Sequence, residues 1–306
     1  MSHHDPIPFE PLSRRASLGA DLLLLGVAMV WGWTFVLVKE GVSEVGPFTF
    51  LFYRFGIAFV VLSLLFRRHL RSVSRSVWTR GALIGLALFG GYWFQTWGLV
   101  YTAATKSAFI TGLSVVLVPI LGATMLRERI GGAAWSGAIL SAIGLGLIVF
   151  GARVGVETVN VGDGLTLVCA LSFATQILLV SHYTRPSNYL PILVAQIGVV
   201  AALSGVGWLT VENAAWTTSW VAWKGILITA LLATALAYWL QNRFQPYSTA
   251  ARAAIIYTGE PVFAGVFGVV LLGERLSLVQ WLGAAAILAA MVLAQLPTIR
   301  RLSGNA

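Results

Sequence analysis

Charged residues are scarce in this chain of 306 residues: they make up 10% of the sequence, against about 25% in a typical soluble domain. The 20 lysines and arginines and 11 aspartates and glutamates are too few to cover the surface of a soluble domain of this size. Apolar residues account for 58%. The composition therefore excludes an ordinary soluble protein and predicts that lipid is the solvent for much of the surface.

Cysteine and histidine are nearly absent as well. The single Cys169 excludes a disulfide framework and a cysteine-based zinc or iron–sulfur site. The four histidines are scattered along the chain, and the sequence has neither a phosphate-binding loop nor a paired nucleophile and base within its apolar runs. We therefore expect no metal, no cofactor and no enzymatic activity. The cations lie between apolar runs instead of forming a patch, so we also expect no nucleic-acid partner.

Long apolar runs fill most of the chain. A membrane-crossing helix needs about 20 apolar residues to cover a hydrocarbon core about 30 Å thick. Ten segments meet that requirement, at residues 20–39, 47–66, 80–101, 104–126, 132–151, 163–182, 188–209, 219–242, 249–272 and 277–296. The sequence therefore predicts an all-α integral membrane protein with ten transmembrane helices and short tails at residues 1–18 and 298–306.

The distribution of cations predicts the orientation of these helices, because positive residues stay preferentially on the cytoplasmic side. Alternate loops are rich in arginine, whereas the opposite loops hold only Lys39, Arg153, Lys224 and Arg275. The arginine-rich set includes both tails. We therefore expect both termini to be cytoplasmic, as an even number of spans requires.

The two halves of the chain resemble each other. At an offset of 146 residues, Tyr92-Trp93-Phe94-Gln95 matches Tyr238-Trp239-Leu240-Gln241, and 16 of the 56 positions from 92 to 147 are identical. Upstream, Asp21 through Val38 matches Asp163 through Val180 at an offset of 142. Apolar composition does not explain the paired tyrosine, tryptophan and glutamine positions. The chain is therefore divided into two repeats, at residues 19–152 and 160–297.

Each repeat holds five spans, and because five is odd, the second copy must enter the membrane from the opposite side. Inverted repeats of this kind recur in secondary transporters, where two halves close alternately over a central site. The sequence thus predicts two inverted five-helix repeats around a central cavity. The alternative is a duplication retained only for packing.

Several segments resemble the ten-span EamA branch of the drug/metabolite transporter superfamily. They are Trp31-Gly32-Trp33-Thr34-Phe35-Val36, Tyr53-Arg54-Phe55, Tyr101 through Arg129, Gln241 through Ala254, Glu260-Pro261-Val262-Phe263, Gly273-Glu274-Arg275-Leu276 and Gln280-Trp281-Leu282-Gly283-Ala284. Arg127 is a departure, because the family often has glycine before the following Glu-Arg pair. The resemblance implies a multi-pass carrier of the inner membrane that exports amino acids or related small metabolites.

Glu260 is the most central acidic residue, about ten residues into the ninth span and roughly 15 Å deep. Polar groups at this depth usually face a cavity or a partner. Glu260 is either a proton-coupling carboxylate or a partner for a substrate ammonium group. The alternative is a structural ion pair or a neutral acid bonded to a tyrosine. The next residue, Pro261, predicts a kink, because it cannot donate a hydrogen bond to the carbonyl of Tyr257.

Three cations fall within or at the edge of spans. Lys106 and Arg252 occupy matching places in the two repeats, where they could steer or gate a substrate carboxylate. The alternative is that their side chains snorkel to lipid headgroups. Arg54 lies deeper in its span, and we favour a structural pairing for it.

Aromatic, amide and hydroxyl residues predict the remaining cavity wall, since flat apolar walls with a few hydrogen-bonding groups suit an amphipathic metabolite. Tyr92 and Gln95 lie three residues apart, as do Tyr238 and Gln241, so each pair projects from one helix face. The alternative for the aromatic residues is a belt at the membrane interface. The full set of expected cavity residues is Trp31, Trp33, Tyr92, Gln95, Thr111, Ser114, Gln176, Tyr238, Gln241, Tyr257 and Glu260.

These features predict a secondary transporter that works by alternating access as a monomer or a homodimer. A small-molecule substrate and the lipid bilayer are the expected partners, and a proton gradient is one candidate driving force. The alternatives are a passive facilitator, or an exporter of cationic drugs, nucleosides or sugars.

Overall fold

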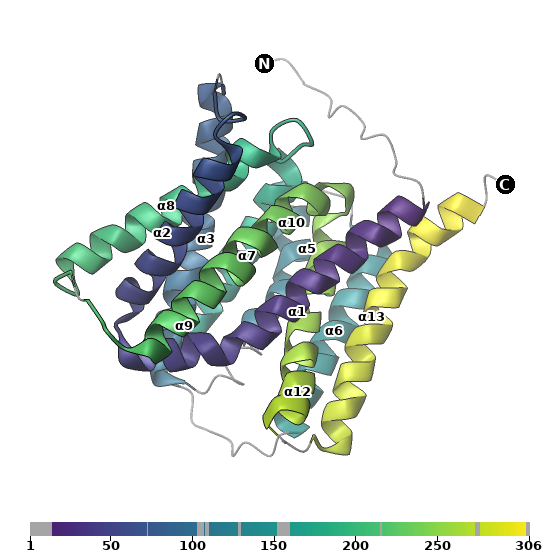
Figure 1. Ribbon diagram of the computed structural model, residues 1–306. Coiled ribbons are helices and arrows are strands. Elements are labelled where there is room, and N and C mark those ends of the chain that lie inside the picture. The colour runs from purple at the N-terminus through teal and green to yellow at the C-terminus, as the bar shows by residue number, and fades with distance from the viewer. Residues whose placement is uncertain are drawn as a thin grey trace.

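The protein is an assembly of helices (Figure 1). The computed structural model describes residues 14–71, 73–102, 107, 110–127, 130–151, 160–214, 216–272 and 276–303. Every regular element in those ranges is helical. The helices are α1 (Arg14–Glu44), α2 (Pro47–Phe66), α3 (Arg75–Tyr101), α5 (Ser114–Met125), α6 (Gly132–Gly151), α7 (Val161–Tyr183), α8 (Tyr189–Thr210), α9 (Trp220–Ile228), η1 (Thr229–Leu236), α10 (Ala237–Phe244), η2 (Gln245–Tyr247), α11 (Ala250–Tyr257), α12 (Gly259–Leu272) and α13 (Leu278–Ser303).

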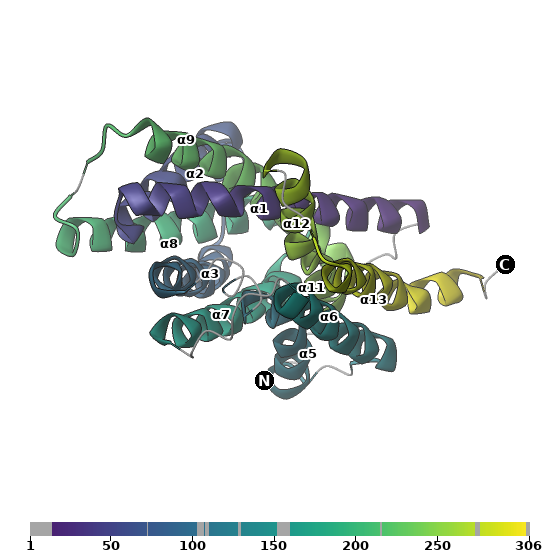
Figure 2. The same ribbon diagram turned by 90° about the horizontal axis from the view of Figure 1, so that it is seen from below.

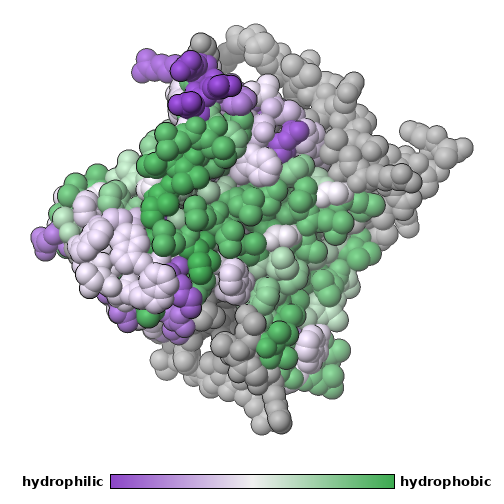
Figure 3. All heavy atoms as spheres, viewed as in Figure 1, coloured by the Kyte–Doolittle hydropathy of each residue, from purple (hydrophilic) through white to green (hydrophobic). Residues whose placement is uncertain are grey.

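Each of the ten apolar segments coincides with helix in the described residues. Six helical stretches there are long and apolar enough to cross a membrane, and the apolar helices at residues 110–125, 132–148 and 278–294 are shorter. Many of the leucines and valines on these helices are exposed. Figure 3 shows a band of apolar side chains across this surface, with hydrophilic side chains gathered at its upper end. A surface of this kind is stable in lipid and not in water.

The predicted fourth and ninth spans are interrupted. The ninth divides at Thr258 into α11 and α12, and the fourth has a turn at Leu113, just before α5. The break at Thr258 precedes Pro261, which lies in the first turn of α12, where a missing N–H is tolerated. The expected interruption is therefore present, but as a break before the proline and not as a kink at it.

The predicted eighth span changes its helical type half-way along. Between α9 and α10, residues Thr229–Leu236 form the π-helix η1. Nothing in this apolar stretch of alanine, leucine and threonine signals the change. Single π-turns are frequent at functional sites, because their wider turn frees backbone groups for other partners.

The helices pack in pairs across the two halves of the chain. α3 packs along α7, α2 along α8, and α6 along α13, while α1 packs against α9, α11 and α12. Figures 1 and 2 both show the start of α1 and the end of α13 at the same end of the molecule. The buried residues form two main hydrophobic clusters, and Trp31 contacts both. The space beside Trp31 is where the candidate site lies.

The contact between α6 and α13 depends on glycine. A Cβ atom at Gly144 would lie 2.7 Å from the carbonyl oxygen of Gly283, whereas one at Gly56 in α2 would have nothing within 4 Å. We expect Gly144→Ala to lower the free energy of unfolding by about 1–3 kcal/mol, because the two helices must move apart. Unfolding in mixed detergent micelles measures this. An equal effect of Gly56→Ala would refute the explanation.

Candidate functional site

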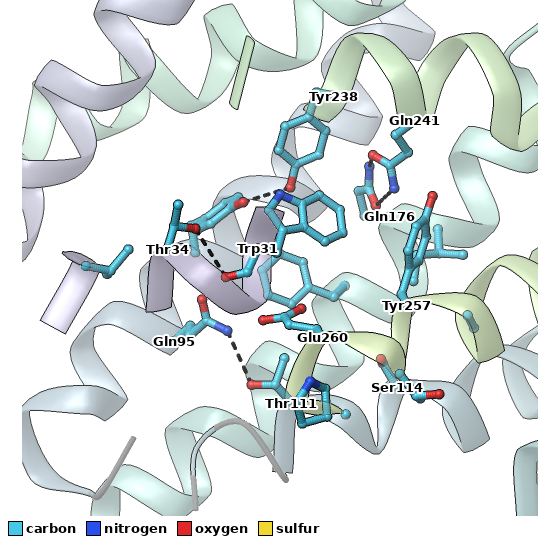
Figure 4. Close-up of a pocket in the computed structure, with 18 of the residues that line it drawn as sticks. Trp31, Thr34, Gln95, Thr111, Ser114, Gln176, Tyr238, Gln241, Tyr257 and Glu260 are labelled. Carbon is cyan, nitrogen blue, oxygen red and sulfur yellow. Dashed lines mark hydrogen bonds between the residues drawn. The ribbon is translucent and has the colours of Figure 1, made fainter. Parts of the chain in front are cut away.

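A cavity lies between the two hydrophobic clusters. Its wall combines aromatic rings, amides, hydroxyls and two charged groups. Figure 4 labels ten of the lining residues, among them Glu260. The lining residues are Trp31, Thr34, Val38, Arg54, Tyr92, Gln95, Leu99, Thr111, Gly112, Ser114, Phe173, Gln176, Ile177, Tyr238, Gln241, Ala254, Tyr257, Thr258, Glu260 and Pro261.

The structure brings together nearly all of the expected cavity residues. Trp33 is the exception, since it is not among the lining residues. It follows Trp31 by two positions in α1, and residues two apart on a helix face in different directions. Trp31 lines the cavity, whereas Trp33, which was expected beside it, does not. Sequence analysis missed Phe173, Thr34 and Thr258. The match between the repeats could have identified Phe173, which corresponds to Trp31, whereas the two threonines carry no such signal.

Two tyrosines from matching places in the sequence repeat meet at the cavity. The hydroxyl of Tyr238 donates a hydrogen bond to that of Tyr92 (3.0 Å), and both side chains are buried. The Trp31 ring packs against Tyr238, with centroids 5.6 Å apart, and the Phe173 ring packs against Tyr92, with centroids 5.3 Å apart. Phe173 matches Trp31 at the 142-residue offset. The two halves therefore contribute equivalent residues to one aromatic wall.

The π-helix η1 holds two cavity residues in place. The indole nitrogen of Trp31 donates to the carbonyl of Ala233 (2.9 Å), and Nε of Arg54 donates to Oγ1 of Thr234 (2.8 Å). Sequence analysis missed both partners, because a backbone carbonyl and a threonine within an apolar run give no signal. The π-turn thus fixes an aromatic ring and a cation on the same side of the cavity.

Arg54 is almost fully buried, with 3% of its surface exposed. Besides Thr234, it donates from Nη2 to the hydroxyl of Tyr92 (3.2 Å), and its guanidinium carbon lies 4.6 Å from the centre of the Tyr92 ring. Within the described part of the chain it forms no ion pair. The structural pairing expected for Arg54 is therefore with hydroxyls and a ring, and its positive charge is not neutralised by a bonded carboxylate.

Glu260 belongs to the first turn of α12, just after the break at Thr258. Its carboxylate lies in the cavity near Trp31 (Figure 4) and makes no hydrogen bond or ion pair with a described residue. Arg54 lines the same cavity. The hydroxyl of Tyr257 donates to Oε1 of Gln245 (3.1 Å), so this tyrosine does not bond Glu260.

Amide side chains continue the polar wall away from Glu260. Gln176 and Gln241 exchange hydrogen bonds of 3.2 and 3.5 Å (Figure 4), and Gln176 also donates to Gln196 (3.5 Å). Gln245, one turn beyond Gln241, donates to the carbonyl of Ile177 (2.8 Å). Gln196 and Gln245 are not among the lining residues. The network therefore extends from the wall to the neighbouring elements and joins α7, α8, α10 and η2.

Of the two cations that were expected to steer or gate a substrate carboxylate, the structure describes one, Arg252. Arg252, at the start of α11, is buried and forms an ion pair with Asp21 of α1. The alternative for Arg252 was a side chain that reaches a lipid headgroup. The structure instead has this side chain in a buried ion pair. Lys106 lies outside the described residues. The partner Asp21 was not among the expected site residues, although it opens the repeat match with Asp163.

Comparison with known proteins identifies the family to which this chain belongs. The model of the EamA-like transporter family matches residues 18–150 and again residues 160–296. The chain belongs to the EamA-like transporter family. As a member of this family it is a multi-pass membrane protein that transports a small molecule.

Relatives of this EamA-like transporter are also named as transporters. An uncharacterised transporter of Archaeoglobus fulgidus is 38% identical over 281 residues, which cover 91% of this chain and 86% of that protein. A probable amino-acid metabolite efflux pump of Escherichia coli is 26% identical over 87% of this chain and 91% of its own length. A solved crystal structure with 19% sequence identity superimposes with a TM-score of 0.77 over 92% of this chain and 98% of that one, a likeness of fold.

Proposed function

We propose that this EamA-like transporter is a secondary transporter of the inner membrane that exports amino acids or related small amphipathic metabolites by alternating access. The observation that carries the proposal is the cavity itself. It combines aromatic walls, amides, a buried cation and a carboxylate at the junction of both halves of the chain. Such walls suit a molecule with an apolar body and a polar end. The E. coli relative named as an amino-acid metabolite efflux pump favours the same substrate class.

Ten spans in two inverted repeats are part of this proposal, and three observations support them. The family model matches the chain twice. The breaks at Leu113 and Thr258 fall within one residue of each other when the repeats are aligned at the 146-residue offset. In addition, α6 contacts α13 at Gly144 against Gly283 and at Gly137 against Ala290. At the 146-residue offset Gly144 matches Ala290 and Gly137 matches Gly283, so the second contact is the first with the two halves exchanged. Broken helices beside a central site are typical of inverted-repeat transporters.

The proposed orientation places both termini in the cytoplasm. The arginine-rich loops support it, as does the position of the start of α1 and the end of α13 at one end of the molecule. The export direction follows from the relative named as an efflux pump and is the part of the proposal most directly open to measurement.

The test is transport by purified protein in liposomes that are preloaded with an equimolar mixture of the protein amino acids. A pH gradient of either sign is imposed, and mass spectrometry identifies what leaves. We expect loss of a subset of amino acids compared with protein-free liposomes. Retention of every amino acid under both gradients would reject this substrate class, and the same assay would then be run with cationic drugs, nucleosides and sugars.

A further inference from the structure

The cavity wall carries one positive and one negative side chain. Among the described lining residues these are Arg54 of α2 and Glu260 of α12. No ion pair joins them in the described part of the chain. Arg54 is buried and Glu260 is partly buried, and a charge that is withdrawn from water is costly unless a partner compensates it. A cavity that keeps two opposite charges apart is complementary to a ligand that carries both.

The donors of Arg54 are only partly used. A guanidinium group has five N–H donors, and Thr234 and Tyr92 accept two hydrogen bonds from Arg54. The remaining N–H groups have no partner within the described part of the chain. The two bonds that exist fix the plane of the group, and a fixed guanidinium binds a carboxylate through two parallel hydrogen bonds.

Neither charge is shared by the two halves of the chain. Continuing the 142-residue offset into α2 and α8 places Gln196 opposite Arg54, and the 146-residue offset places Ser114 opposite Glu260. Gln196 is fully buried, as Arg54 nearly is. The two tyrosines at the centre are the same in both halves, whereas the two charges occur once each. A neutral residue therefore serves the structural role in one half, and the charge in the other half needs a different explanation.

We infer that the substrate of this cavity is a zwitterion, whose carboxylate binds Arg54 and whose ammonium group binds Glu260. The inference rests on the proposed function and narrows it to α-amino acids with both groups free. The rings of Trp31, Tyr92 and Tyr238 line the same cavity and pack against one another, so we expect the side chain of the substrate to be apolar.

The test compares three forms of each apolar amino acid in proteoliposomes: the free amino acid, its carboxamide, which lacks the carboxylate, and its N-acetyl derivative, which lacks the ammonium group. We expect the wild-type protein to transport the free form about tenfold to a hundredfold faster than either derivative, the ratio that corresponds to a lost charge-assisted hydrogen bond. Arg54→Gln should remove the preference over the carboxamide and keep the preference over the N-acetyl form. Glu260→Gln should do the reverse.

Matched controls are Arg68→Gln and Glu44→Gln, since both side chains are exposed and lie outside the cavity wall. Arg54→Lys keeps the charge and loses the planar fork, and should give an intermediate preference. If no form moves, the proposed function fails. If carboxamides move as fast as free amino acids in the wild-type protein, the function stands and zwitterion recognition is wrong. Comparing the free amino acids with their derivatives in the wild-type protein tests zwitterion recognition even if Arg54→Gln does not fold.

Discussion

Glu260→Gln is expected to abolish transport of substrate against its concentration gradient while exchange of substrate across the membrane continues. Its carboxylate lies in the cavity without a bonded partner among the described residues. A proton and a substrate ammonium group therefore compete for the same oxygens. If the empty carrier returns only with Glu260 protonated, each outward step of the substrate is linked to an inward step of a proton. Glutamine is permanently neutral and breaks that link.

Proteoliposomes with a pH gradient, and separately with equal substrate on both sides, measure the two processes. Exchange should be followed at saturating substrate, because Glu260→Gln also weakens the binding of the ammonium group. Glu44→Gln, at the exposed end of α1, is the matched control. Uphill transport that survives Glu260→Gln would exclude this carboxylate from coupling. Wild-type protein that equilibrates substrate without responding to a pH gradient would favour a passive facilitator.

The helices and much of the cavity wall could be predicted from sequence because both depend on local spacing. Apolar runs of sufficient length locate the helices, and the three-residue spacing of Tyr92 and Gln95 places them on one face of α3, where the structure has them. The match between repeats then identifies Tyr238 and Gln241 at the corresponding place. Trp33 was expected beside Trp31 as part of the aromatic and amide set, but residues two positions apart on a helix point in different directions, and only Trp31 lines the cavity.

The partners of the buried charges could not be predicted, because they depend on tertiary contacts. Arg54 is held by Thr234, 180 residues away, and Arg252 pairs with Asp21, 231 residues away. The π-helix that presents Thr234 has no glycine or proline to reveal it. From sequence, a cation near a helix end is equally compatible with a lipid headgroup, and only the packing of α1 against α11 selects the ion pair.

Asp21→Asn is expected to lower the free energy of unfolding by about 3–5 kcal/mol, because it removes the carboxylate that pairs with the buried Arg252. Both residues are more than nine-tenths buried, and the pair joins α1 to the first turn of α11. Titration with a denaturing detergent, followed by the loss of helix, measures the change. Glu44→Gln on the same helix removes an exposed acid and should change little.

The double variant Asp21→Asn with Arg252→Gln distinguishes the interaction between the two residues from the individual effect of each substitution. With both charges removed, no uncompensated charge stays buried, so the double variant should be more stable than the sum of the two single losses implies. Strictly additive losses would show that the two residues act independently and would contradict the pairing. A rescued double variant that also transports would show that the ion pair stabilises the fold, whereas a rescued but inactive one would show that the two charges are needed for transport as well as for stability.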